Sequence, residues 1–343
     1  MFESYTIKDV AKALGLSTST ISRALNGSYE ISPETKKLVL EYAEKINYRP
    51  NPIALSLKEQ KSHSIGVVVC EVANNFFSQA INGIESIAYN RGYHVIITQT
   101  HESFDRESTN VQHLLSRHVD GLLVSLSAET TDISQYKYLH EKGFPIVFFD
   151  RVAADIETHK ITANNFKGSF DATESFINKG FTRIAHLTNS NNLLISQERV
   201  NGYKNALDLY GIPIKNEYLK FCDHGGMIQD EVELAIKELL SLEERPQAIF
   251  ISSDRLTISC MHILKNMGLK VPEDIAVAGF TNSDVAELFD PPLTVVRQPA
   301  FQIGQIATEL LIKTIESKRA IEEYTIQQMD TELIVRASSE KLM

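Results

Sequence analysis

Residues 6–27 place two short amphipathic helices around a tight turn, and this pattern limits what the N-terminal segment can fold into. Thr6 can cap the first helix, because its hydroxyl can accept from the backbone N–H of Asp9 while the Asp9 carboxylate reaches back. Gly15 can end this helix in the left-handed conformation, and Ser17 can cap a second helix from Thr18 to Leu25. Two short helices joined by a turn that contains glycine indicate a helix-turn-helix.

A third helix is expected to begin after Ser32, with Pro33 as its first residue, and to end near Ile46. The outer face of the second helix carries only small polar or basic side chains, namely Thr18, Ser19, Ser22 and Arg23. Such side chains can enter a DNA major groove and form hydrogen bonds with base edges. The simpler interpretation is a three-helix bundle whose polar face is only solvated.

A second feature follows the bundle at residues 47–58. Pro50 prevents the third helix from continuing, whereas Asn51 as a cap and Pro52 as a first residue favour a new helix. That helix has fewer than two turns, and its Leu55 and Leu57 have no local core. We predict a hinge helix that orders only beside its twin and inserts an apolar wedge into a base step. A plain linker is the alternative.

Length and composition exclude several classes of protein. A chain of 343 residues predicts two or three domains. We expect no signal peptide and no membrane span, because the N-terminus is a capped amphipathic helix and no apolar run is long enough. Cys70, Cys222 and Cys260 are widely spaced in apolar contexts, which favours free thiols over a disulfide framework or a metal site. These features predict a cytoplasmic protein.

The charge is distributed unevenly along the chain. Residues 1–60 carry eight Lys or Arg and seven Asp or Glu, whereas the whole chain has a net charge of −10. Because phosphate neutralisation supplies most non-specific affinity for DNA, a headpiece of about +1 must depend on dimerisation and specific contacts. The acidic remainder should keep DNA at the headpiece.

From Ile65 onward, short runs rich in Val, Ile and Leu alternate with amphipathic helices, and glycines separate helix ends from the following strands. Strands are expected at 65–69, 94–98, 121–126, 146–150, 183–188, 248–252 and 275–280. This alternation predicts parallel sheets covered on both faces. A ligand should bind at the carboxyl ends of the strands.

Several segments closely resemble the lactose/galactose-repressor (LacI/GalR) family of bacterial transcription regulators. The runs TIKDVAKALGLSTSTISRALNG (6–27), NYRPNPIALSLK (47–58) and SIGVVV (64–69) are similar to the family's headpiece, hinge and first core strand. The similarity continues through NNFFSQAINGIE (74–85), HVDGLLV (118–124), GFPIVFFDR (143–151), VPEDIAVAGF (271–280) and TELIVRASS (331–339). It covers essentially the whole chain in order.

The resemblance implies an all-α helix-turn-helix headpiece and an α/β core of two doubly wound parallel-sheet subdomains, like that of periplasmic binding proteins. We expect the headpiece at 1–50, the hinge helix and linker at 51–61, and the core at 62–343. The core would comprise an N-terminal subdomain (about 62–161 and 293–322) and a C-terminal subdomain (about 162–290 and 325–343). The chain would cross between them near 161–164, 290–293 and 322–326.

The implied function is sequence-specific binding of a pseudo-palindromic operator in double-stranded DNA by a homodimer, most simply as a repressor. The expected DNA-binding residues are Thr6, Ser17, Thr18, Ser19, Ser22, Arg23, Asn26, Tyr48, Asn51, Ala54, Leu57 and Lys58, with Leu57 as the minor-groove wedge. A small molecule between the core subdomains would control operator affinity. Control by a partner protein is the alternative.

Pocket residues are expected at the ends of the core strands. The candidates are Asn75, Phe76, Phe77, Asp150, Arg151, Arg199, His224, Ser253, Asp254 and Thr281, of which Arg199, His224 and Thr281 match family pocket positions. Core packing is the alternative for Phe77, a structural ion pair for Asp150 and Arg151, and helix capping for Asp254.

Two departures from the family pattern bear on the ligand. Many members have Asp where this chain has Thr281, and purine-responsive members have an arginine where it has Leu193. A less charged pocket favours a sugar or sugar derivative over a purine.

Catalysis and metal binding find no support in the sequence. Phosphate-binding loops, zinc-protease and nucleophile-elbow motifs and paired cysteines are all missing from the sequence. The ten histidines have no ligand spacing. We expect neither an enzyme nor a metal site nor a cofactor. An exported binding protein would share the core but would need a signal peptide in place of the headpiece.

Overall fold

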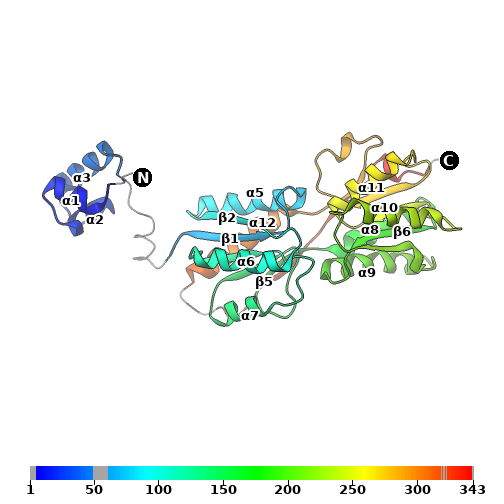
Figure 1. Ribbon diagram of the computed structural model, residues 1–343, viewed down its shortest axis with the longest axis horizontal. Coiled ribbons are helices and arrows are strands. Elements are labelled where there is room, and N and C mark those ends of the chain that lie inside the picture. The colour runs from blue at the N-terminus through cyan, green and yellow to red at the C-terminus, as the bar shows by residue number, and fades with distance from the viewer. Residues whose placement is uncertain (1–4, 49–60, 318, 320, 322, 342–343) are drawn as a thin grey trace. The chain divides into compact units, whose positions relative to one another are not determined.

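The computed structural model describes residues 5–48, 61–317, 319, 321 and 323–341, in two compact units that divide between His63 and Ser64. The first unit is a three-helix headpiece formed by α1 (Ile7–Leu14), α2 (Thr18–Leu25) and α3 (Pro33–Lys45). The second unit holds two six-stranded sheets (Figure 1).

The headpiece helices begin and end at the residues that the sequence predicts. Thr6 and Asp9 form the capping box of α1, and Gly15 ends that helix with a φ of +65°. Ser17 caps α2 and Ser32 caps α3, each by accepting from a backbone N–H in the first turn. The core of this unit is formed by Val10, Ala11, Ile21, Ala24 and Val39.

The N-terminal subdomain is built on one sheet with the strand order β11-β5-β4-β3-β1-β2, all parallel. Its strands are β1 (Ser64–Val69), β2 (His94–Gln99), β3 (Gly121–Val124), β4 (Ile146–Phe149), β5 (His159–Ala163) and β11 (Ile326–Met329). Its helices are α5 (Asn75–Asn90), α6 (Phe104–Ser116), α7 (Ser134–Glu141) and α12 (Ala300–Glu316).

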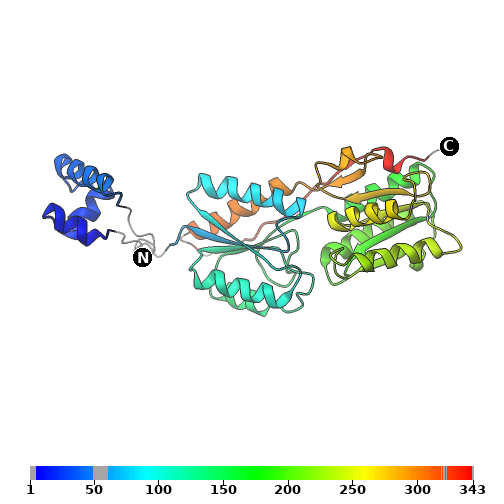
Figure 2. The ribbon, with the colours of Figure 1, turned by 45° about the horizontal axis from the view of Figure 1, so that its top comes forward.

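Alternate residues of these strands face two separate cores. Val67 and Val69 of β1 pack with α5 and α12, whereas Val68 packs with α6 and α7. Figure 2 shows α5 and α12 together on one side of this sheet. They approach closely because Gly304 lacks a side chain, and a Cβ there would lie 2.1 Å from the Ala80 carbonyl oxygen.

The C-terminal subdomain repeats this plan with the strand order β12-β10-β9-β8-β6-β7. Its strands are β6 (Ile184–Asn189), β7 (Leu219–Cys222), β8 (Ala248–Ile251), β9 (Ala276–Phe280), β10 (Thr294–Arg297) and β12 (Glu332–Ile334). Helices α8 (Asn165–Asn178) and α9 (Leu194–Leu209) cover one face, and α10 (Gln229–Ser241) and α11 (Asp254–Asn266) cover the other. Short 3-10 turns lie at Asn216–Tyr218, Ala286–Leu288 and Ala337–Ser339. β12 runs antiparallel to its neighbour, β10, and the other pairs of this sheet are parallel.

The chain crosses between the subdomains three times. The first crossing lies between Ala163 and Asn165, within the predicted range. The other two follow Arg297 and Met329, because β10 pairs with β9 and β11 pairs with β5. The predicted crossings near 290–293 and 322–326 are therefore wrong by several residues. Four-residue strands carry too little pattern to be told from a connecting segment.

Candidate functional site

The headpiece presents α2 with a polar, solvent-exposed face. Ile21 and Ala24 are buried in the bundle, whereas Thr18, Ser19 and Arg23 are exposed. The Ser17 hydroxyl accepts from the backbone N–H of Thr20 at 3.1 Å and thereby caps the start of α2. Ser17 is itself exposed to solvent. Ser22 is half-buried on the same helix. This face has the size and chemistry of a major-groove reader.

Arg23 forms an ion pair with Glu30 at 3.0 Å, and 59% of the Arg23 side chain is exposed. Exposed pairs of this kind contribute about 0–1 kcal/mol, so the guanidinium can leave Glu30 for a base edge at little cost. The geometry is compatible with base reading by Arg23.

Of the remaining predicted DNA contacts, three lie within the described residues and four lie outside them. Asn26 is exposed at the end of α2, whereas Thr6 donates its hydroxyl to Asp9 at 2.7 Å, a hydrogen bond that holds the pKa of Asp9 below its usual value. Tyr48 packs partly against the headpiece core, and this burial raises the pKa of its phenol. The predicted contacts at Asn51, Ala54, Leu57 and Lys58 lie outside the described residues.

Two cavities lie between the subdomains of the core. The wide cavity has a volume of about 750 Å³, with His101, Glu102, Ala128 and Glu129 on the N-terminal side and 190–192, Phe221, Asp223, His224, Met227 and Ile228 on the other. The narrow cavity has about 40 Å³ and shares Glu102 and Met227 with the wide one. It is also lined by Cys70, Glu71, Asn74, Phe77 and Arg151 from one subdomain and by Asn189, Gly225, Ser253 and Arg255 from the other.

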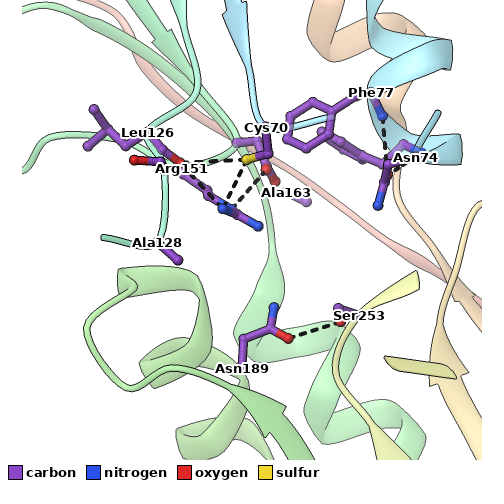
Figure 3. Close-up of polar contacts among 12 residues, drawn as sticks. Cys70, Asn74, Phe77, Leu126, Ala128, Arg151, Ala163, Asn189 and Ser253 are labelled. Atoms are coloured by element: carbon purple, nitrogen blue, oxygen red, sulfur yellow. Dashed lines mark hydrogen bonds and ion pairs between the residues drawn. The ribbon is translucent and has the colours of Figure 1, made fainter. Parts of the chain in front are cut away.

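Arg151 is the charged centre of the narrow cavity. Its Nη1 donates to the Glu102 carboxylate at 2.6 Å and to the Cys70 sulfur at 3.0 Å, and both side chains of the ion pair are more than four-fifths buried (Figure 3 shows Arg151 and Cys70). Burial alone would raise the pKa of Glu102, but the adjacent guanidinium holds it below its usual value. Glu102 also accepts from the backbone N–H of Ala128 at 2.8 Å. Glu102 therefore connects Ala128, in the loop after β3, with Arg151 at the end of β4.

Asp150 and Arg199, both predicted ligand contacts, line neither cavity. Asp150 has a φ of +57° directly after β4, and burial raises the pKa of its carboxyl. Arg199 is buried, donates to Asn165 and to the Ser252 carbonyl, and lies 4.0 Å from the centre of the Phe280 ring. Burial lowers the pKa of Arg199 to about 10. In this conformation the Arg199 guanidinium already donates its hydrogen bonds to other groups of the protein.

Asn75, Asp254 and Thr281 form one polar cluster that joins the subdomains. The Asn75 side chain donates to Asp254 at 3.0 Å, and the Thr281 hydroxyl donates to the other oxygen of the same carboxylate. Asp254 is the first residue of α11 and Ser253 occupies the cap position, so Asp254 acts as a bridge rather than as the cap. A second cross-cleft contact is the ion pair of Arg255 with Glu71.

Of the other predicted pocket residues, Phe77, Ser253 and His224 line a cavity and Phe76 is buried in the core. Phe77 lines the narrow cavity, and Phe76 is buried beside it with the ring centroids 5.3 Å apart. Ser253 donates to Asn189 at 3.0 Å at the edge of this cavity (Figure 3). His224 lines the wide cavity, 3.4 Å from Glu231. Leu193, the residue that argues against a purine, is buried and lines neither cavity.

Sequence reasoning missed most residues of the wide cavity. Glu102 follows β2, and Phe221 and Asp223 lie in or directly after β7, a strand that the sequence analysis did not identify. The rule that ligands bind at the carboxyl ends of strands applies to Glu102 after the recognised strand β2, and it would have pointed to Phe221 and Asp223 once β7 was recognised. Among the described residues, no group of three or more His, Cys, Asp or Glu could hold a metal ion. No helix in the described ranges has the length and apolar character to cross a membrane.

Comparison with known proteins shows the family. Residues 6–51 match the model for bacterial regulatory proteins of the lacI family, and residues 173–339 match the periplasmic binding protein-like domain. The HTH-type transcriptional repressor PurR of Vibrio vulnificus (strain CMCP6) is 33% identical over 337 residues, which cover 98% of this chain and 99% of that protein. The chain belongs to the LacI family. It is a DNA-binding transcriptional repressor and not an enzyme.

Solved structures of this family agree with the fold. The complex of the regulator CelR with cellobiose is 28% identical, with a TM-score of 0.72, and the match covers 97% of this chain and 99% of CelR. The lac repressor dimer bound to operator and the anti-inducer ONPF is 23% identical, with a TM-score of 0.82, and covers 99% of this chain and 100% of that chain. This second likeness confirms the headpiece-plus-two-sheets fold predicted from the sequence.

Proposed function

We propose that this LacI-family repressor binds a pseudo-palindromic operator as a homodimer and that a sugar or sugar derivative in the wide cavity controls its operator affinity. The observation that carries the ligand part is the wide cavity itself, whose volume of about 750 Å³ suits a small molecule and whose lining comes from both subdomains. A ligand there contacts both halves at once, so it can favour one relative orientation over another. Cellobiose in the related CelR supports a carbohydrate.

The DNA part is supported by the exposed face of α2. In a dimer, two copies of α2 would enter successive major grooves, with Thr18, Ser19 and Arg23 at base edges and Ser17 at a phosphate. The hinge residues Asn51, Ala54, Leu57 and Lys58 would enter the minor groove as a paired element. Because operator DNA in bacteria lies in the cytoplasm, we place the repressor there.

Coupling between the two activities would pass through the N-terminal subdomain. Ligand-dependent rotation of this subdomain would change the spacing of the paired hinges and thereby shift operator affinity. Couplings of this kind are about 1–3 kcal/mol, or roughly 5- to 150-fold in affinity.

Isothermal titration of the full-length repressor with a panel of neutral, amino and phosphorylated sugars and one purine base tests the ligand part. We expect saturable binding of at least one sugar, and we expect that sugar to change the affinity for a selected operator. Binding of the purine base but no sugar would contradict the carbohydrate class. No binding of any compound would contradict small-molecule control and favour a partner protein.

A further inference from the structure

We propose that the ligand of the wide cavity is a polyhydroxy compound that carries a protonated amine, such as an amino sugar. This inference rests on the proposed function and narrows it to one ligand class. It follows from the charges and the apolar side chains that line the cavity.

The guanidinium groups near the two cavities are already paired. Arg151 is held by Glu102 at 2.6 Å, and Arg255 forms an ion pair with Glu71 across the cleft. No lysine lines either cavity among the described residues. A phosphate or carboxylate on the ligand would therefore have to displace an existing carboxylate to gain a cation, at the cost of leaving that carboxylate unpaired.

Two carboxylates that line the wide cavity have no cationic partner among the residues that the structure describes. Glu129 comes from the N-terminal subdomain and Asp223 from the C-terminal one, so they lie on opposite walls. Within the described ranges, the Glu129 carboxylate accepts only from the backbone N–H of Phe104, at 3.2 Å. The Asp223 carboxylate has no hydrogen-bond donor or ion-pair partner in the described part of the chain. Together they give the cavity a negative potential that attracts an ammonium group.

The same cavity carries exposed apolar side chains. Phe221, Met227 and Ile228 have 40%, 40% and 43% of their surface exposed, and all three line the cavity. Phe221 lies in β7 and Asp223 directly follows this strand, and both residues line the wide cavity. An aromatic face beside a carboxylate suits an ammonium group, because the ring attracts the cation that the carboxylate neutralises. The apolar side chains can pack against the C–H face of a sugar ring.

Two histidines also line the wide cavity. His224 lies beside Glu231, which also accepts from the backbone N–H groups of Asp223 and His224. His101 also lines the wall. Because His224 is already engaged by the Glu231 carboxylate, it is not the partner of Glu129 or Asp223.

Matched sets of ligands test the inference by isothermal titration of the full-length repressor at pH 7. Each set contains a 2-amino sugar, its neutral parent, its N-acetyl form and the 6-phosphate of the parent. In the N-acetyl form an uncharged amide replaces the amine. The sets cover the gluco, galacto and manno series. We expect one amino sugar to bind roughly tenfold or more tightly than its parent and N-acetyl form, the size expected for one charge-assisted hydrogen bond. The preference should shrink at high salt.

Two variants separate a local contact from the overall charge. D223N and E129Q should each lower the ratio of amino-sugar affinity to neutral-parent affinity by several fold. D208N, which removes an exposed carboxylate from α9, is the matched control and should leave this ratio unchanged.

The outcomes distinguish this inference from the function on which it rests. Equal binding of the amino sugar and its parent, tighter binding of the 6-phosphate, or a preference that survives D223N together with E129Q would overturn the inference and leave sugar control intact. No binding of any sugar would overturn both.

Discussion

Replacing Arg151 with methionine should destabilise the core, because the guanidinium neutralises a carboxylate that is largely removed from water. The Glu102 side chain is 17% exposed and that of Arg151 is 11% exposed, so R151M leaves a mostly buried charge without a partner. Breaking one side of a buried pair costs about 3–5 kcal/mol. We expect a loss in this range in the free energy of unfolding at pH 7, measured by urea denaturation followed by circular dichroism.

The pH dependence of this loss identifies its cause. Arg151 holds the pKa of Glu102 below its usual value, so in the native protein the pair contributes stability above about pH 4 and loses it on acidification. In R151M, burial raises the pKa of Glu102, and the carboxyl can escape the penalty by binding a proton. The loss should therefore be smaller at pH 5 than at pH 7.

A double variant provides the control. In E102Q/R151M the side-chain oxygen at position 102 can still accept from the backbone N–H of Ala128, but position 102 no longer carries a charge. We expect it to regain more than half of the stability lost in R151M. A loss below about 1 kcal/mol in R151M, or an equal loss at pH 5 and pH 7, would refute the reasoning.

Three further predictions concern other parts of the chain. S17A removes the cap of α2 and should cost about 1 kcal/mol of headpiece stability, measured by thermal unfolding of the full chain at the headpiece transition; an unchanged transition would exclude capping as its role. R23A should cost roughly 1–3 kcal/mol at one base step of a selected operator, and an equal loss on all duplexes would make Arg23 a phosphate contact. His186 is buried between aromatic rings, and burial lowers its pKa to about 3, so the folded protein holds it neutral. The free energy of unfolding should therefore fall as the pH drops below about 6.5, by up to about 1.4 kcal/mol per pH unit. H186F should reduce this pH dependence, and an equal pH dependence of the two proteins in urea titrations would contradict the prediction.

Local signals made the headpiece predictable. Thr6, Ser17, Ser32 and Gly15 act within one turn of their own positions, so their capping and terminating roles can be inferred without knowledge of tertiary contacts. The central strands were equally easy to predict from the sequence, because strands buried on both faces are continuous apolar runs.

The sheet edges were harder to predict. β7 at one edge has four residues of which only Cys222 is buried, and β11 carries two glutamines, so neither resembles a buried strand. Their partners are chosen by long-range packing rather than by local sequence. This is why the predicted crossing near 322–326, which involves β11, is wrong.

The site was predicted only in part for a related reason. Of the predicted contacts, Arg151, Phe77, Ser253 and His224 line the cavities, and these residues follow recognised strands or match family positions. Arg199 does not, since its guanidinium is turned toward Asn165 and the Ser252 carbonyl. Such pairings depend on neighbours distant in the sequence.

The central claim is that the headpiece reads DNA under the control of a ligand bound between the core subdomains. Its most direct measurement is the affinity of the full-length repressor, at fixed physiological salt, for a duplex selected from random sequence, with and without a saturating cavity ligand. We predict a pseudo-palindromic preference over bulk DNA and a change of roughly 5- to 150-fold on adding the ligand. Equal affinity for selected and bulk DNA, or an affinity unchanged by a ligand that demonstrably binds, would contradict the account.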